Sequence, residues 1–161
     1  MAGKHNITLT VNGLEYQPSV EPRRRLGDFL REDLGLTGTH LSCEHGVCGV
    51  CTVIMNGKPA LSCLTFAVQA DGAHVATVEG LAQGDNLSTL QQKFWEKHAL
   101  QCGFCTPGFL MALSHLFARE PDASDDAIAE TIDSVLCRCT GYQNIFEAAV
   151  AARDALIQTK S

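Results

Sequence analysis

Eight cysteines are the residues of this 161-residue chain whose type and spacing could do chemistry. The most unusual pair is Cys137 and Cys139, which one residue separates directly before a predicted helix start. In an extended segment, residues i and i+2 point to the same side, about 6.6 Å apart at about 3.3 Å per residue. A disulfide at that spacing would be strained. Two thiolates pointing the same way could instead hold a metal, provided that two more ligands lie elsewhere.

Four cysteines of the first half have the spacing of a plant-type [2Fe-2S] site, Cys-x4-Cys-x2-Cys followed by a separate fourth cysteine. They are Cys43, Cys48, Cys51 and Cys63. The loop must wrap round a rhombic cluster, and Gly46 and Gly49 let its backbone come close enough for N–H groups to bond the sulfurs. Structural zinc prefers two closely spaced ligand pairs and fits this set less well.

The other four cysteines form a second set in the second half of the chain. They are Cys102, Cys105, Cys137 and Cys139. Each pair precedes a predicted helix N-cap, Thr106 or Thr140, and the partial positive charge of a helix N-terminus favours thiolates and an anionic cluster. From spacing alone zinc remains an alternative here, because Cys-x2-Cys with a second pair is typical of zinc sites. The Cys-x-Cys pair is less usual for zinc.

Composition and missing motifs narrow the class of protein. The net charge of -6 has the wrong sign for a nucleic-acid or anionic-membrane partner, and no apolar run is long enough to span a membrane. We recognise no signal peptide, so we expect a cytoplasmic chain with reduced thiols that bind metal. The sequence shows no phosphate-binding glycine motif and no nucleophile–base arrangement. We therefore predict metal sites without a catalytic residue.

The elements that must position these cysteines differ between the two halves. Residues 7–11 alternate in polarity, and Asn12-Gly13 is a hairpin signal. Further strands are expected at residues 14–16, 52–55, 59–61 and 74–78, with another turn at Asn56-Gly57-Lys58 and one helix at 25–33. This pattern predicts an α+β domain over residues 1–79.

The second half has helical periodicity throughout, which predicts a four-helix bundle over residues 80–161 after a linker at 80–86. The helices are expected at residues 87–98, 106–119, from Ser124, and from Thr140 to 158. In the first helix we expect core packing for Leu87, Leu90, Phe94 and Trp95. Leu110 is also expected in the core, whereas Phe104 and Phe109 could lie in the core or at an interface.

Three stretches carry a family resemblance: "CEHGVCGVCT" with Cys63, "QCGFCTPG" and "CRCTGYQNI". They resemble the small iron–sulfur subunit of molybdenum hydroxylases, the xanthine oxidase family, in its bacterial three-subunit form. The likeness extends from about residue 5 to residue 156. It implies a ferredoxin-like (β-grasp) domain and a helical-bundle domain with one [2Fe-2S] cluster each. Ser42 and Val50 depart from the family's usual glycine and alanine, but neither change removes a ligand.

The same resemblance implies cofactors and partners outside this chain. Molybdopterin, as the cytosine dinucleotide, would lie on a large subunit and FAD on a medium subunit, in a dimer of heterotrimers. Gln101 matches the family glutamine that hydrogen-bonds the pterin, and Cys139 matches the cysteine between cluster and pterin.

The resemblance also implies the function. Single electrons would pass from the molybdopterin centre through the bundle cluster and then the ferredoxin-like cluster to FAD, and the chain would catalyse nothing alone. The substrate of the complex would be an N-heteroaromatic compound, an aldehyde, carbon monoxide or an acyl-CoA. A stand-alone two-cluster ferredoxin and a zinc-stabilised interaction module are the alternatives.

Overall fold

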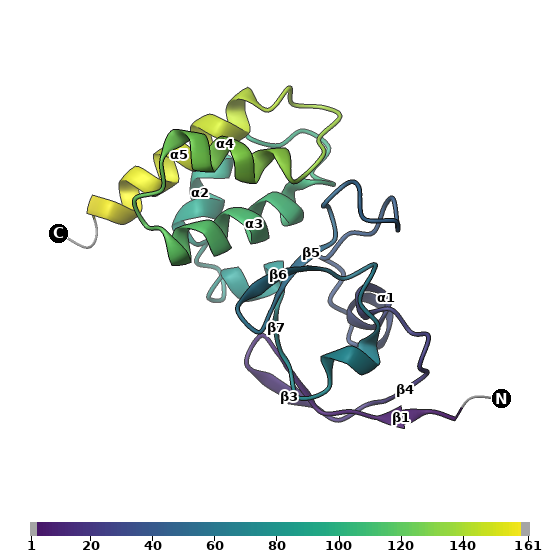
Figure 1. Cartoon of the computed structure of the whole chain (residues 1–161). Coiled ribbons are helices and arrows are strands. Elements are labelled where there is room, and N and C mark those ends of the chain that lie inside the picture. The colour runs from purple at the N-terminus through teal and green to yellow at the C-terminus, as the bar shows by residue number, and fades with distance from the viewer. Residues whose placement is uncertain (1–2, 159–161) are drawn as a thin grey trace.

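The computed structural model describes residues 3–158. Figure 1 shows the strands gathered in the first half of the chain, and the helices α2 to α5 of the second half packed together beside them. The fold is therefore mixed α/β, with all described strands in the first half and the longer helices in the second. No helix among the described residues is long and apolar enough to cross a membrane.

Five strands of the first half form one mixed sheet in the order β3-β2-β7-β5-β6. Their bounds are β2 (Leu9–Val11), β3 (Leu14–Tyr16), β5 (Thr52–Met55), β6 (Lys58–Leu61) and β7 (His74–Ala76). Strands β2 and β7 are parallel, and the other neighbours are antiparallel. A separate pair joins β1 (His5–Asn6) to β4 (Ser19–Val20).

The two predicted hairpins of the sheet are confirmed, and the same two-residue turn makes both. Asn12 and Gly13 have φ values of 49° and 84°, and Asn56 and Gly57 have values of 50° and 75°. Positive φ at both central residues matches the right-handed twist of the flanking strands.

One helix packs on this sheet, as the pattern of residues 25–33 predicts. It begins as α1 (Leu26–Asp28) and continues as the π-helical turn η1 (Phe29–Asp33). Leu26, Phe29 and Leu30 are fully buried in the core of the first half. Two short 3-10 helices, η2 (Ala67–Ala70) and η3 (Val78–Leu81), complete this half.

The second half consists of four helices among the described residues. They are α2 (Thr89–Glu96), α3 (Thr106–Arg119), α4 (Asp125–Asp133) and α5 (Gln143–Gln158). Helix α2 packs on α5, and α4 contacts both α3 and α5. Phe109, Leu113, Ile128 and Ile145 are fully buried between them. The predicted boundary between residues 79 and 80 stays a prediction, and residues 1–2 and 159–161 of the two predicted domains lie outside the described residues.

Two of the four helix starts follow ordinary capping chemistry. The Ser124 hydroxyl accepts the N–H of Ala127 at 3.2 Å, which confirms the predicted cap of α4. Ser88 and Gln91 form a capping box at the start of α2. Helix α2 therefore begins at Thr89, two residues later than the predicted start at residue 87.

The predicted N-caps Thr106 and Thr140 are wrong. Cys105 is the N-cap of α3, and Thr106 is already the first helical residue. Helix α5 begins only at Gln143, because Gly141 and Tyr142 have φ values of 67° and 69° and cannot continue a right-handed helix.

Two of the four residues expected in the core of α2 are exposed instead. Leu90 and Phe94 are buried, whereas Trp95 is 72% exposed and Leu87 is 53% exposed. Leu90 and Phe94 are four residues apart and lie on one face of the helix. Trp95 follows one residue later, about 100° further round at 3.6 residues per turn, and points to solvent.

A loop of the first half is inserted against the helices of the second. Cys48 and Val50 belong to the buried core of the helical half. A Cβ atom on Gly49 would lie 2.0 Å from the carbonyl oxygen of Ser134. A Cβ atom on Gly108 of α3 would lie 2.9 Å from the carbonyl oxygen of Gly49 and 3.0 Å from the Cα atom of Val50. The two halves therefore touch backbone to backbone, with glycine at both sides of the contact.

Replacing Gly49 by alanine should cost more stability than the same change at Gly57. Both glycines have positive φ, so each substitution carries the left-handed penalty of about 1–2 kcal/mol. Gly57 has nothing within 4 Å of its added Cβ, whereas Gly49→Ala meets a backbone carbonyl and should cost a further ~1–3 kcal/mol through overpacking. Urea unfolding of both variants measures the difference. Equal losses would contradict the backbone contact.

The neighbouring aromatic residues of α2 should respond oppositely to truncation. Phe94→Ala removes a fully buried ring and should lower the free energy of unfolding by about 3–5 kcal/mol. Trp95→Ala removes an exposed ring and should change it by no more than about 0.5 kcal/mol. Thermal unfolding of the two variants checks this, and a large loss at Trp95 would place that ring in a packed contact.

Candidate metal centres

The first cysteine set is brought together by a loop with three left-handed residues. Glu44, Gly46 and Gly49 have φ values of 55°, 86° and 66°, so the backbone turns repeatedly between Cys43 and Cys51. The N–H of Cys48 donates to the sulfur of Cys43 at 3.4 Å.

The fourth cysteine of this set reaches the loop from the end of β6. Cys63 follows that strand by two residues, and its thiol lies near those of Cys51 and Cys43. The hydroxyl of Ser62 holds the same junction by donating to the carbonyl oxygen of Cys51 at 2.9 Å. Cys43, Cys51 and Cys63 therefore lie close together, and Cys48 joins them through its backbone amide.

The thiols of this first set differ in acidity. Backbone N–H donors, first that of His45 and then those of Cys48 and Val47, lower the pKa of Cys43 to about 6. Burial, followed by the neighbouring Cys51 and Cys43, raises the pKa of Cys63 to about 12. The site thus stabilises a thiolate at its rim and leaves a buried thiol whose ionisation requires a nearby cation. An iron cluster supplies that positive charge, because metal coordination deprotonates a thiol outright.

Arg25 joins the two segments that carry the first set, a role that the sequence did not reveal. Its guanidinium forms an ion pair with Glu44, next to Cys43. The two residues that follow it donate backbone N–H groups to the Cys63 segment: Leu26 to Thr65 at 2.7 Å and Gly27 to Ser62 at 2.9 Å. The start of α1 thus contacts both sides of the site.

The second cysteine set lines one cavity of about 600 Å³. The sulfurs of Cys102 and Cys139 lie 3.6 Å apart, and the thiol of Cys105 lies near that of Cys137. Cys102 and Cys139 are exposed, whereas Cys105 is buried and Cys137 is half-buried. The set therefore has an outer pair and an inner pair, and all four predicted cysteines share the cavity.

Thr140 and Tyr142 surround Cys137 of the inner pair. The hydroxyl of Thr140 lies 3.1 Å from the sulfur of Cys137, and the N–H of Thr140 donates to the same sulfur at 3.4 Å. The N–H of Cys137 itself donates to the phenol oxygen of Tyr142 at 2.9 Å. Burial alone would raise the pKa of Cys137, but the hydroxyl and N–H of Thr140 at its sulfur help to outweigh burial, and the pKa is lowered. Thr140 therefore bonds the sulfur of Cys137 and does not cap a helix.

The donor set of this cavity fits a [2Fe-2S] cluster. Its described lining contains the four thiols of the second set together with Cys48, and neither histidine nor carboxylate, and Arg138 supplies a positive charge. The N-terminus of α3 begins directly after Cys105 and favours an anion. The hydroxyl oxygen of Thr106 is buried without a hydrogen-bond partner among the described residues. Burial raises the pKa of Cys105 to about 12, so this thiol too requires a cation to ionise.

A single backbone hydrogen bond connects the two cysteine sets. The N–H of Leu136 donates to the carbonyl oxygen of Cys48 at 2.9 Å. Cys48 belongs to the first set, and Leu136 directly precedes Cys137 of the second. Cys48 and Val50 also line the cavity of the second set. The two candidate sites are thus adjacent, although the sequence places them in different halves.

An exposed rim surrounds the outer pair of the second set. It comprises Gln101, Phe104 and Leu136; Phe104 is 44% exposed and Leu136 is 51% exposed. His40 stacks on Phe104 with ring centroids 4.7 Å apart and fixes its orientation. Of the residues that could lie in the core or at an interface, Phe109 is therefore core and Phe104 is surface. Leu110 is buried, as predicted.

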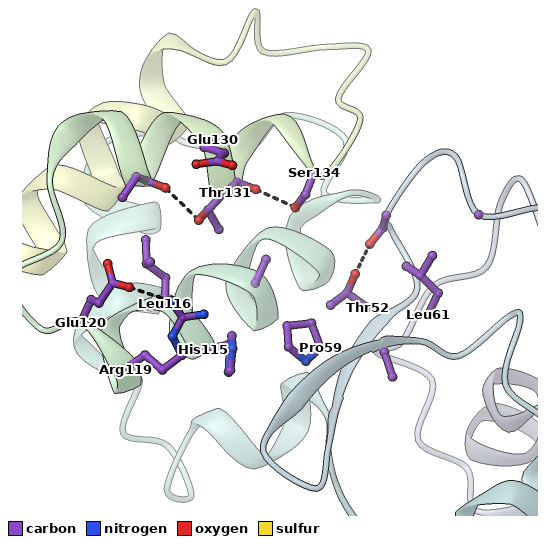
Figure 2. A pocket seen from close by; sticks show the side chains of 15 residues that line it. Thr52, Pro59, Leu61, His115, Leu116, Arg119, Glu120, Glu130, Thr131 and Ser134 are labelled. Carbon is purple, nitrogen blue, oxygen red and sulfur yellow. Dashed lines mark hydrogen bonds and ion pairs between the residues drawn. The ribbon is translucent and has the colours of Figure 1, made fainter.

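A second cavity, of about 570 Å³, lies between the two halves, and Gly46 and Gly49 of the first cysteine loop are part of its lining. Figure 2 shows it between Pro59 on the sheet side, His115 and Arg119 of α3, and Glu130 of α4. Its described lining includes no cysteine. Burial, and then the charge of Arg119, lower the pKa of His115. We assign no ligand to this cavity.

Comparison with known proteins identifies both cysteine sets with iron–sulfur domains. Residues 37–91 match the model of a 2Fe-2S iron-sulfur cluster binding domain, and residues 77–150 match that of a [2Fe-2S] binding domain. The first match includes the four cysteines of the first set, and the second match includes the four cysteines of the second set.

Similar proteins match along almost the whole chain. Caffeine dehydrogenase subunit gamma of Pseudomonas sp. (strain CBB1) is 55% identical, with 89% of this chain and 88% of that protein covered. The nicotine 6-hydroxylase small subunit of Paenarthrobacter nicotinovorans is 49% identical, with 91% and 88% covered. The crystal structure of quinoline 2-oxidoreductase from Pseudomonas putida 86 superposes with a TM-score of 0.92 at 46% identity, covering 99% of both chains.

The sequence motifs, the two adjacent sets of four thiols and these relatives agree. The chain is an iron–sulfur, electron-transferring part of an oxidoreductase complex and belongs to the small [2Fe-2S] subunits of the molybdenum hydroxylases, the xanthine oxidase family.

Proposed function

We propose that this subunit relays single electrons between a molybdopterin centre on a large partner subunit and FAD on a medium partner subunit. Two [2Fe-2S] clusters would supply the one-electron chemistry. Cys43, Cys48, Cys51 and Cys63 would hold the cluster on the flavin side, and Cys102, Cys105, Cys137 and Cys139 the cluster on the molybdopterin side. The chain's own contribution is to hold both clusters at a fixed separation, to set their potentials and to exclude water.

The observation that carries this proposal is the hydrogen bond from Leu136 to Cys48. This bond links Cys48, which belongs to the first cysteine set, to Leu136, which directly precedes Cys137 of the second set. It crosses the junction of the two halves. A relay needs two centres that are close and rigidly spaced. A protein with two unrelated structural metal sites has no such need.

The exposed rim supports a protein partner at the second cluster. We propose that Gln101 hydrogen-bonds the pterin, as the molybdopterin cytosine dinucleotide, and that Cys139 lies between cluster and pterin. Both residues are exposed on the same rim as Phe104 and Leu136. An exposed aromatic ring and leucine beside a redox centre are features of an interface.

The substrate of the whole complex that we favour is an N-heteroaromatic compound. The relatives described above are named for caffeine, nicotine and quinoline, each of which contains a nitrogen heterocycle. Aldehydes, carbon monoxide and acyl-CoA compounds are the less favoured classes. Because the substrate pocket would lie on the large subunit, this choice rests on the relatives alone.

The finer architecture belongs to the same proposal. We place a ferredoxin-like β-grasp domain at residues 1–79 and a four-helix bundle at residues 80–161, in a dimer of heterotrimers. The order of the sheet and the four packed helices support this division. The eight cysteines are free thiols, which suits the reducing cytoplasm that we propose as the location.

Metal analysis separates the alternatives. Four irons per chain with co-purifying molybdenum and flavin are expected for the relay subunit. Four irons without partners would indicate a stand-alone ferredoxin, and zinc in the second set would indicate a structural module.

Cys137→Ser should abolish the second cluster and leave the first intact. Serine replaces the thiolate on the inner side of the cavity, and the iron content should fall from about four to about two per chain, since a [2Fe-2S] cluster requires all four thiolates. Low-temperature EPR after reduction should then show one [2Fe-2S] signal instead of two. In the complete complex, substrate should no longer reduce the flavin.

The matched variant Cys63→Ser should give the converse result, with loss of the first cluster and retention of the second. Flavin reduction that survives either substitution would disprove the two-cluster relay.

The rim should be required for assembly with the large subunit. Phe104→Asp places a charge in the centre of the proposed interface and should lower co-purification of the large subunit at least about tenfold, equivalent to about 1.4 kcal/mol. The control is Trp95→Asp, because Trp95 is more exposed than Phe104 but does not line the cavity of the second cysteine set. Equal effects of the two variants would remove the rim from the interface.

A further inference from the structure

Tyr142 interlocks with the turn that carries the inner ligand Cys137. Its backbone N–H donates to the hydroxyl of Thr140 at 3.2 Å. That hydroxyl accepts this bond and still has its own hydrogen, which the sulfur of Cys137 can accept at 3.1 Å. The phenol oxygen of Tyr142 accepts the N–H of Cys137 at 2.9 Å. Tyr142 is thus hydrogen-bonded to the turn 137–140 through both its backbone N–H and its phenol oxygen.

The backbone of Tyr142 is in a conformation that a tyrosine seldom adopts. Its φ of 69° lies in the left-handed region, which is costly for a bulky side chain. The ring is fixed by an edge-to-face contact with the fully buried Phe109, at 6.3 Å between centroids and 78° between planes. Such a conformation persists only where the surroundings impose it, and such residues concentrate at functional sites.

The phenol proton of Tyr142 is the unused donor of this arrangement. A phenol oxygen can accept one hydrogen bond and donate another. The oxygen accepts from Cys137, and no acceptor for its proton is present among residues 3–158. Tyr142 is half-buried and lines the cavity that the four cysteines of the second set share. The acceptor chemistry in that cavity is sulfur.

We propose that the Tyr142 hydroxyl donates a hydrogen bond to a sulfur of the second cluster and raises the reduction potential of that cluster. This inference rests on the proposed function, since it requires a cluster on Cys102, Cys105, Cys137 and Cys139. Reduction adds negative charge to the cluster, so a hydrogen-bond donor stabilises the reduced form more than the oxidised form. Tyr142 is thus a positioning residue for Cys137 that also sets the potential.

The test is Tyr142→Phe in the complete complex, with the potentials of both clusters measured by EPR-monitored redox titration. The ring and its contact with Phe109 are retained, and only the hydroxyl is lost. We expect the equilibrium constant for reduction of the second cluster to fall about tenfold, which is 59 mV for one electron. The first cluster in the same molecule is the internal reference and should not change.

Tyr16→Phe is the matched control, because Tyr16 is the other tyrosine of the chain and lies in β3 on the sheet. It should leave both potentials unchanged. ENDOR spectroscopy in deuterated water adds a direct readout: Tyr142→Phe should remove one exchangeable deuteron coupled to the second cluster.

A second substitution keeps the hydroxyl and changes its donor strength. 3,5-Difluorotyrosine at position 142 has a more acidic phenol and should raise the potential of the second cluster, opposite to Tyr142→Phe. If Tyr142→Phe does not assemble the second cluster, the difluorotyrosine variant still tests whether the hydroxyl sets the potential of that cluster.

An unchanged potential with difluorotyrosine, or with a loaded Tyr142→Phe variant, would overturn the inference and leave the relay standing. A wild-type complex without a second [2Fe-2S] signal would instead overturn the proposed function itself.

Discussion

The amide of Leu136 donates to the carbonyl of Cys48 across the junction of the two halves. This bond requires the two backbones to lie close together, and the residues around it allow that approach. Gly49 follows Cys48 and lies against the Ser134 carbonyl without space for a Cβ atom. Gly108 of α3 also lies against the backbone of Gly49 and Val50, again without space for a Cβ atom. The separation of the two thiol sets is therefore fixed by backbone contacts, which rotamer changes of side chains cannot alter.

Each set combines thiols that ionise easily with thiols that resist ionisation. N–H and hydroxyl donors surround Cys43 and Cys137, whereas burial dominates at Cys63 and Cys105. This division follows from position in the fold: the donors occur where the chain turns, and burial occurs where a strand or helix begins or ends. A buried thiol without a cation stays protonated, so the inner half of each site suits metal rather than free thiolate chemistry.

Local signals made the cysteine spacings, the two Asn-Gly hairpins and the Ser124 cap predictable from the sequence. Each depends on residues within a few positions of one another. The caps at Thr106 and Thr140 were wrong: Cys105 takes the N-cap position of α3, and the Thr140 hydroxyl bonds Cys137 and Tyr142 within one turn instead of a helix end. The role of Arg25 was missed because its partner Glu44 is distant in the sequence, and the role of Tyr142 because spacing does not reveal side-chain hydrogen bonds within a turn. The tyrosine in "CRCTGY" was a visible signal, but nothing in the sequence showed which atom its hydroxyl contacts.

The insertion of Cys48 and Val50 into the helical core limits how modular this protein can be. Along the chain the two halves look separable, because strands precede helices and a short connection joins them. In space the loop that carries three cysteines of the first set also lines the cavity of the second set. Chimeras that exchange one half between relatives must therefore keep loop 43–51 matched to the helices that receive it, and the two metal sites are constrained to diverge together.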